Sequence, residues 1–164
     1  MLILSKLIQV LDLQHLLLGE HQQHQLLLDG RMTNVDLAHS VGISAPPCLR
    51  RVRALEKAGY LTGYHADVDS AKLGFTVTVF AMVGLHSQAD KDLQAFEGLV
   101  RSWPEVRECH MLNGDIDFIL KCVSEDLSSF QMFLTQKLTP APNVANVKTS
   151  LTIRQTKKQP GVPL

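Results

Sequence analysis

The second half of the chain alternates between strand-like and helix-like patterns, and this order restricts the possible folds more than any other feature of the sequence. β-Branched residues and local alternation of apolar and polar residues predict strands at 76–85, 106–112, 117–123 and 144–153. Apolar residues at helical spacing predict helices at 90–103 and 126–138. The order strand, helix, strand, strand, helix, strand is that of the split βαβ, or ferredoxin-like, arrangement.

The turn between the second and third predicted strands contains Asn113-Gly114. This pair is a strong hairpin signal, because both residues readily adopt the positive φ that a tight two-residue turn requires. In the simplest interpretation the segment is a plain hairpin turn, with Asp115 and Asp117 solvated beside it.

Two helices joined by a tight turn are predicted ahead of this sheet. Thr33 followed by Asp36 is typical of a helix start, and Gly42 of a helix end. Ser44 is a suitable N-cap for a second helix. The proline pair 46–47 then falls in the first turn of that helix, where a missing N–H group costs nothing. The pattern predicts a helix-turn-helix followed by a turn-rich connector with a strand between Tyr60 and Asp69.

Three arginines give the second helix a local positive charge in a neutral chain. Sixteen Lys and Arg residues balance sixteen Asp and Glu residues, so attraction to nucleic acid must come from a local patch. Within residues 44–64, four cations are opposed by Glu56 alone. A solvated cationic face is the alternative interpretation, but the preceding helix and turn favour a helix that enters a DNA major groove. We expect this helix to expose Arg50, Arg51 and Arg53 and to bury Leu49, Val52 and Leu55.

The first nineteen residues are strongly apolar, and they must be distinguished from a signal peptide. Lys6, Asp12 and His15 interrupt the run, no basic segment precedes it and no A-x-A cleavage site follows it. It is also too polar to cross a bilayer comfortably. The pattern therefore predicts an amphipathic helix.

From about Asp29 to Lys157 the sequence resembles the Lrp/AsnC family of transcriptional regulators. The resemblance is carried by GRMTNVDLAHSVGISAPPCLRRVRALEKAGYLTGYHADVD in the first half and by VRECHMLNGDIDFILKCV in the second. It implies an α+β protein with an N-terminal (winged) helix-turn-helix domain followed by a ferredoxin-like βαββαβ ligand-sensing domain. The implied function is that of a cytoplasmic, sequence-specific DNA-binding regulator that responds to a small effector, an amino acid.

The family resemblance also implies assembly and domain boundaries. Members of the family dimerise through the sheet of the sensing domain and form larger even-numbered oligomers, so a pseudo-palindromic operator is expected. The predicted boundaries are a DNA-binding domain at 1–62, a connector at 63–75, an effector-binding and oligomerisation domain at 76–154 and a tail at 155–164. Gln22 and Gln23 stand where the family carries apolar residues in its first helix. An alternative therefore remains open, in which the chain is an amino-acid-binding oligomer with impaired or lost DNA binding.

Two sets of contact residues follow from these arguments. The DNA contacts are predicted to be Ser44, Ala45, Pro46, Pro47, Arg50, Arg51 and Arg53. By resemblance to the family, the effector contacts are Asn113, Gly114, Asp115, Asp117, Leu127, Ser150, Leu151 and Thr152. A loop with little side-chain cover offers N–H groups to an α-carboxylate, and an acid beside it can meet an α-ammonium.

No motif in the sequence predicts an enzyme, a cofactor or a metal site. His21 and His24 have no carboxylate or thiol to complete a ligand set. Cys109 and His110 are adjacent in a predicted strand, so their side chains point to opposite faces and cannot form a nucleophile–base pair. The three cysteines show no CxxC spacing, which favours reduced thiols in a cytosolic protein.

Overall fold

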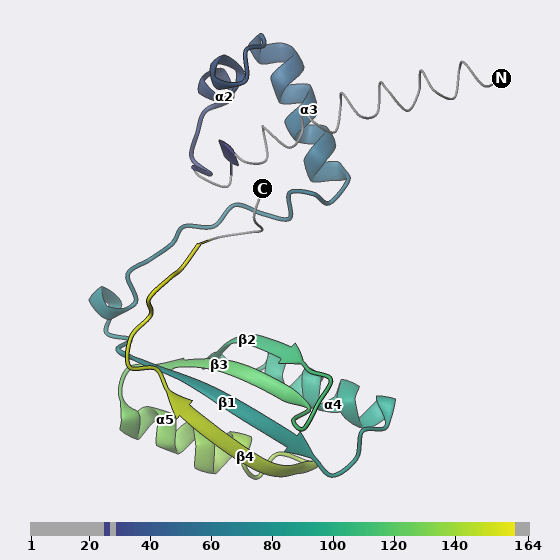
Figure 1. Ribbon diagram of the computed structural model, residues 1–164, viewed down its shortest axis with the longest axis vertical. Helices are drawn as coiled ribbons and strands as arrows, with labels where there is room; N and C mark the ends of the chain where they lie inside the picture. The colour runs from purple at the N-terminus through teal and green to yellow at the C-terminus, as the bar shows by residue number, and fades with distance from the viewer. Residues whose placement is uncertain (1–24, 27–28, 160–164) are drawn as a thin grey trace, which may run out of the picture. The chain divides into compact units, whose positions relative to one another are not determined.

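The computed structural model describes residues 25–26 and 29–159, and these residues form two compact units (Figure 1). The first unit comprises the described residues up to Asp67 together with those from Lys158 onward, and the second spans Val68–Lys157. The predicted N-terminal amphipathic helix and the pair Gln22-Gln23 lie outside the described residues. Within the described ranges, no helix is long and apolar enough to cross a membrane.

The first unit contains the two predicted helices, α2 (Asn34–Ser40) and α3 (Ala45–Lys57). Thr33 begins α2 as its N-cap: the Asp36 N–H donates to the Thr33 hydroxyl at 3.2 Å, and this hydroxyl donates to the Asp36 carboxylate at 2.6 Å. The turn between the helices contains Gly42 with φ of 71°, a conformation in which a side chain is strained. The predicted helix start and the predicted helix end are both confirmed.

Ser44 occupies the N-cap position of α3, as predicted, but its side chain makes no capping hydrogen bond. An N-cap oxygen ordinarily accepts from the N–H of the second or third helical residue. Those residues here are Pro46 and Pro47, which have no N–H to donate. The prediction that Ser44 occupies the N-cap position is thus correct. The expected hydrogen bond from the helix to its hydroxyl is absent because the two prolines have no N–H group.

The first unit has a small core formed by the buried residues Leu37, Ala38 and Cys48. Val52, four residues after Cys48, packs against this core. Leu49 is 38% exposed, so the expectation that it packs inward is wrong. Successive residues of a helix are rotated by about 100°, and because Cys48 lies at the centre of the buried face, Leu49 turns away from it.

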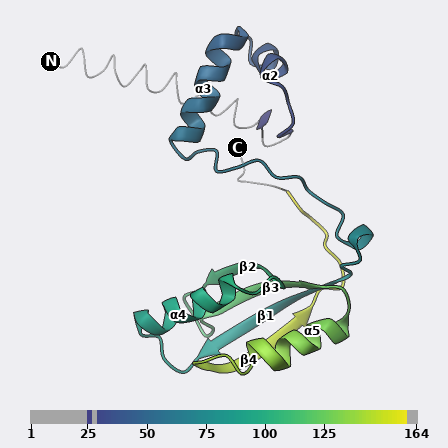
Figure 2. The ribbon, with the colours of Figure 1, turned by 180° about the vertical axis from the view of Figure 1, so that it is seen from behind.

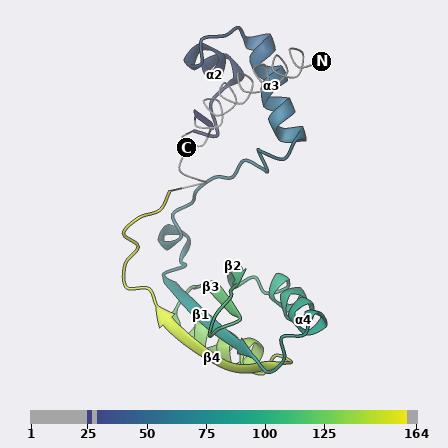
Figure 3. The same cartoon turned by 45° about the vertical axis from the view of Figure 1, so that its right-hand side comes forward.

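The second unit is a four-stranded antiparallel sheet with the order β2-β3-β1-β4. Figure 3 shows β2 and β4 at its opposite edges. The bounds of the strands are β1 (Val77–Leu85), β2 (Val106–Met111), β3 (Phe118–Ser124) and β4 (Val144–Leu151). The predicted ferredoxin-like arrangement is confirmed.

Two helices cover one face of this sheet, as Figure 2 shows from behind. They are α4 (Asp90–Arg101) and α5 (Leu127–Phe133), and α5 continues as the π-helical segment η2 (Leu134–Leu138). Their apolar faces meet the inward residues of the strands in one aromatic core. Phe96 of α4 lies on Phe118 of β3 with ring centroids 4.9 Å apart.

The connector before the sheet has no strand. Residues 61–69 form no helix or strand, and in this stretch no backbone hydrogen bond to a neighbouring strand is present. A strand requires a partner for its N–H and C=O groups, and none of the four described strands pairs with this stretch. The strand expected between Tyr60 and Asp69 is therefore wrong. A single 3₁₀ turn, η1 (Ala71–Leu73), precedes β1.

Candidate DNA-binding helix and effector-binding loop

Helix α3 carries the candidate DNA contacts on its exposed face. Arg50 and Arg53 are exposed, as expected, whereas Arg51 is half-buried and its Nη1 atom is buried with no hydrogen-bond partner among the described residues. Arg51 lies three residues after the buried Cys48, so it points toward the edge of the core. The expectation that all three arginines project into solvent is therefore correct for two of them.

The positive charge of α3 is not neutralised within the described part of the chain. None of its three arginines forms an ion pair there. Glu56, the one acidic residue of α3, accepts a hydrogen bond from the Tyr64 hydroxyl at 3.0 Å. Burial and this carboxylate raise the pKa of Tyr64 above its ordinary value. Glu56 thus binds a neutral hydroxyl and leaves the cations available to an external anion.

The N-terminal end of α3 is held against α2 by an asparagine that the sequence reading did not single out. The Asn34 side-chain amide donates to the Ala45 carbonyl at 2.9 Å, so the first residue of α2 is tied to the first residue of α3. Ser44 and Pro46 are exposed at this end. Because the two prolines remove two N–H groups, an anion here would meet side chains more than backbone donors.

The loop after β2 is longer than a two-residue hairpin turn. Met111 and Phe118 form the last strand pair, so the loop spans 112–117 and is closed by a hydrogen bond from the Leu112 N–H to the Asp117 carbonyl. Neither Asn113 nor Gly114 has a positive φ. The predicted tight turn is therefore wrong in its geometry, because a six-residue loop reverses the chain without left-handed residues.

The two acids of this loop have different environments. Asp117 is 9% exposed, and its two oxygens accept from the Leu85 N–H at 2.6 Å and from the Gln88 amide at 2.8 Å. Asp115 is exposed and makes no hydrogen bond or ion pair with a described residue. In this chain Asp117 anchors the loop to the end of β1, and Asp115 is available to a ligand.

The remaining candidate effector contacts lie at the other end of the sheet. Leu151 pairs with Val79, while the Asp117 N–H donates to the Val83 carbonyl. Four residues of extended strand separate those two positions by about 13 Å. Leu127 also belongs to the far end, since it follows Ser124, which pairs with Val77 at the start of β1. The candidate effector contacts therefore form two groups. Asn113–Asp117 lie at one end of the sheet, and Leu127 and Ser150–Thr152 lie toward the other end.

All three cysteines are outside disulfides, and they differ in burial. Cys48 and Cys122 are buried, and Cys109 is half-buried. Burial, followed by the nearby Glu105 and Cys109, raises the pKa of Cys122 to about 12. Among the described residues there is no group of three or more His, Cys, Asp or Glu side chains arranged to hold a metal ion.

Comparison with known protein families gives matches to both units. Residues 24–62 match the model of a winged helix-turn-helix DNA-binding domain, and residues 78–162 match that of the Lrp/AsnC ligand binding domain. The chain is 55% identical over 129 residues to a leucine-responsive regulatory protein of Rhizobium meliloti, covering 79% of this chain and 83% of that protein. It is 39% identical over 136 residues to the Bkd operon transcriptional regulator of Pseudomonas aeruginosa, covering 83% and 89% of the two chains.

Solved structures of similar proteins agree with these matches. A transcriptional regulator of Neisseria meningitidis in complex with L-Met superposes with a TM-score of 0.84 at 29% identity, over 89% of this chain and 94% of that one. An AsnC family transcriptional regulator of Agrobacterium tumefaciens superposes with a TM-score of 0.83 at 28% identity, over 89% and 95%.

Proposed function

Since this chain belongs to the Lrp/AsnC family of DNA-binding, amino-acid-responsive transcriptional regulators and is not an enzyme, we propose that α3 contacts the operator and that the effector binds between subunits. The protein acts on DNA in the cytoplasm.

The unpaired cations of α3 carry the DNA assignment. Arg50 and Arg53 are exposed and form no ion pair with a described residue. Both lie on α3, the second helix of the helix-turn-helix. Such a helix enters the major groove with its N-terminal half, where arginines reach guanine edges or phosphates. Arg51 contributes from the edge of the core, and residues 44–47 lie at the end of α3 that would approach the duplex first.

The experiment is a salt-dependent binding titration on fragments selected from genomic DNA. Arg53→Ala should weaken binding by about 1–3 kcal/mol if this arginine reads a guanine. If it contacts a phosphate, affinity should fall evenly across sequences and the salt dependence should become shallower. Arg101→Ala is the matched control, because Arg101 is an exposed arginine of the second unit. Equal affinity of wild type and the triple variant Arg50→Ala, Arg51→Ala, Arg53→Ala contradicts the assignment.

The open face of the sheet supports a dimer. The helices cover one face, and on the other face Phe80, Met82, Ile119 and Val123 remain partly exposed. Apolar side chains gathered on a sheet face are protected when a second copy covers them. A dimer carries two copies of α3, so the operator is a pseudo-palindrome with half-sites about one helical turn apart, or a multiple of this. Sedimentation at micromolar concentration should give an even-numbered species.

The separation of the candidate contacts supports an effector site shared between subunits. Asn113, Gly114 and Asp115 lie at one end of the sheet, and Leu127, Ser150, Leu151 and Thr152 lie at or toward the other. One small ligand cannot contact both groups of one chain across about 13 Å of strand. A neighbouring subunit that presents its far end to this loop completes the site. Asp117 acts by holding the loop in position, and Asp115 meets the α-ammonium.

The effector is an apolar amino acid. The relative from Rhizobium meliloti is named for its response to leucine, and the neighbour from Neisseria meningitidis holds L-Met. Leucine or methionine should change the affinity for DNA by about 5–150-fold, the range of typical coupling energies, and DNA should change the affinity for the effector by the same factor. Lysine is the control ligand. An unchanged affinity for DNA at saturating concentrations of both apolar amino acids contradicts this proposal.

A further inference from the structure

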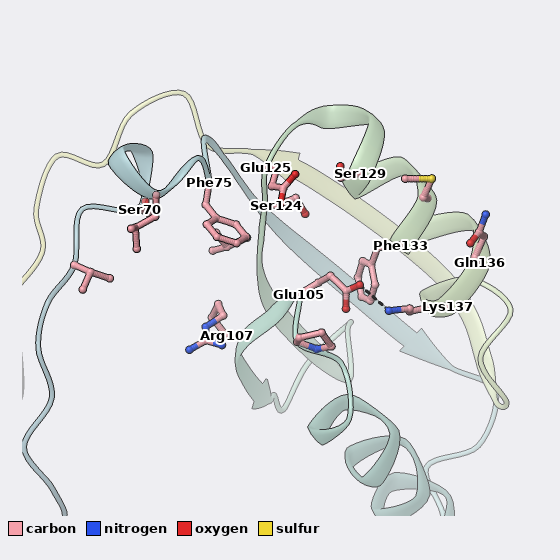
Figure 4. A pocket seen from close by; sticks show the side chains of 15 residues that line it. Ser70, Phe75, Glu105, Arg107, Ser124, Glu125, Ser129, Phe133, Gln136 and Lys137 are labelled. Carbon is pink, nitrogen blue, oxygen red and sulfur yellow. Dashed lines mark hydrogen bonds and ion pairs between the residues drawn. The ribbon is translucent and has the colours of Figure 1, made fainter.

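A pocket of about 830 Å³ lies in the second unit, at the end of the sheet where β1 begins (Figure 4). Its walls come from the segment around η1, from the start of β2, from the end of β3 and from α5 with η2. The volume is within the range of about 300–1,000 Å³ that is usual for small-molecule sites. None of the candidate effector contacts is among its lining residues, neither the loop 112–117 nor Leu127 and Ser150–Thr152.

The walls of this pocket contain two buried polar atoms that have no partner among the described residues. Ser124 is 5% exposed, and its Oγ makes no hydrogen bond. The Glu105 carboxylate accepts from the Lys137 ammonium through Oε1 at 2.7 Å, while its Oε2 is buried without a partner. Most buried polar atoms in proteins are hydrogen-bonded. Two exceptions in one pocket indicate a ligand that supplies polar groups.

The other walls define the rest of that ligand. Phe75, Met132 and Phe133 give the pocket an apolar surface. Arg107 lines the pocket, is exposed and has no ion pair within the described ranges. A carboxylate oxygen accepts a charge-assisted hydrogen bond from an ammonium, and a guanidinium donates such bonds to a carboxylate. The charged residues of the lining are Glu105, Glu125, Arg107 and Lys137, so their charges sum to zero.

We propose that this pocket is a second small-molecule site, which binds an apolar zwitterion through its ammonium at Glu105 and its carboxylate at Arg107. The hydroxyl of Ser124 adds a hydrogen bond, and Phe75, Met132 and Phe133 hold the apolar body. A bulky amino acid and a short apolar peptide share this chemistry. The size of the pocket accommodates both, and the experiment distinguishes them.

The single tryptophan of the chain provides the readout. Trp103 contacts Phe133 edge to face, with ring centroids 5.6 Å apart, and it immediately precedes Pro104 and Glu105 of the pocket wall. The full-length protein is titrated with phenylalanine and with the dipeptide phenylalanyl-leucine, and tryptophan emission is followed. N-acetyl-phenylalanine amide, which lacks both charges, is the third probe. A saturable change with one zwitterion, and at least about tenfold weaker binding of the uncharged probe, is expected.

Two substitutions at the same ion pair separate ligand binding from a structural role. Glu105→Gln removes the acceptor charge and should weaken binding by about tenfold or more. Lys137→Met removes the same ion pair but keeps the carboxylate, so binding should be retained. Asp90→Asn, at an exposed acid of α4 that belongs to neither site, should leave this titration unchanged.

Three results overturn the proposal. The first is the absence of saturable binding of either zwitterion to wild-type protein. The second is an equal loss in Glu105→Gln and Lys137→Met, which would assign the ion pair a purely structural role. The third is a titration that Asp115→Asn abolishes and Glu105→Gln does not, which would assign the signal to the effector loop. Failure of the DNA response to leucine or methionine has no bearing on these readouts, so the two proposals fail independently.

Discussion

The two units of this chain reach an ordered structure by different means. Among its described residues, the first unit buries Leu37, Ala38 and Cys48 in one cluster. The second buries eleven residues in one cluster, among them four phenylalanines. In the described part of the first unit, local features define the helix ends: a threonine cap, a proline pair and a left-handed glycine.

The two units also differ in how their candidate contact residues are distributed along the chain. The candidate DNA contacts are close together in the sequence, on a single helix whose start is held to α2 by Asn34. The candidate effector contacts are spread over 113–152 and lie at different ends of the sheet. Local signals are therefore sufficient to predict a candidate DNA-binding helix, whereas the proposed effector site would combine residues from two subunits.

The largest effect is expected in the aromatic core. Phe118→Ala should lower the free energy of unfolding of the second unit by about 3–5 kcal/mol, because it leaves a cavity beside Phe96. Denaturant unfolding followed by the emission of Trp103 reports on this unit. Met111→Ala, at an exposed position, is the control. If the two variants unfold at the same denaturant concentration, the second unit does not depend on its core as this comparison requires.

The next effect separates the two acids of the loop. The buried Asp117 carboxylate accepts hydrogen bonds from the Leu85 N–H and from the Gln88 amide. Because Asp117→Asn replaces one of the two acceptor oxygens with a donor, we expect the second unit to lose about 1–3 kcal/mol of stability. Asp115→Asn should leave stability within about 0.5 kcal/mol of wild type, as is usual for exposed positions. Thermal unfolding of both variants tests this. Equal midpoints would mean that Asp117 does not anchor the loop.

A smaller effect is expected at the turn of the first unit. Gly42 has φ of 71°, and Gly42→Ala should cost about 1–2 kcal/mol because the added Cβ is strained in this conformation. Gly98→Ala is the matched control in the second unit, where Gly98 lies inside α4 with open space around it. This change should stabilise by about 0.4–1 kcal/mol. Hydrogen exchange of the α2 and α4 amides measures the stability of the first and second unit separately. If both variants lose stability, or both gain it, the expected difference between the two glycines is contradicted.

The smallest effect concerns the surface pair Glu108–Lys121, in which nitrogen and oxygen are 2.5 Å apart. The hydrogen bond from Lys121, with a smaller contribution from His110, lowers the pKa of Glu108 below its ordinary value. A lowered carboxyl pKa adds stability above the unfolded-state pKa, and this stability is lost as pH falls through the folded-state pKa. Because Glu108 is largely exposed, Lys121→Met should cost about 0.5 kcal/mol or less at pH 7, and this cost should become smaller as pH falls through the pKa of Glu108. A loss that is undiminished at pH 3 would assign the effect to packing.

The sequence predicted those parts of the structure that local chemistry determines. Strand and helix order, the Thr33 cap and the glycine at Gly42 all follow from residues within a few positions of one another. Several predictions failed where contacts with another element decide. Residues 61–69 form no strand because none of the described strands pairs with them, and Leu49 is exposed because Cys48 faces α2.

The candidate effector residues show the same limit. Resemblance to a family supplied Asp115 and Asp117 as a pair, and the sequence contains nothing that ranks them. Their ranking depends on Leu85 and Gln88, about thirty residues away, which occupy the oxygens of Asp117. The pocket beside Glu105 and Ser124 had no sequence signal, since its walls come from segments that are far apart in the sequence.

Mixing two variant chains tests most directly the claim that the effector site is shared between subunits. Asp115→Asn impairs the loop, and Leu151→Asp impairs the opposite end of the sheet. Each variant alone should lose the response of DNA affinity to leucine or methionine, whereas effector-free DNA binding should remain. Co-refolded mixtures should regain part of the response, because a mixed pair of chains contains one site in which both halves are intact. If the mixture responds no better than either variant alone, the site does not combine residues from two chains in this way, and the account is contradicted.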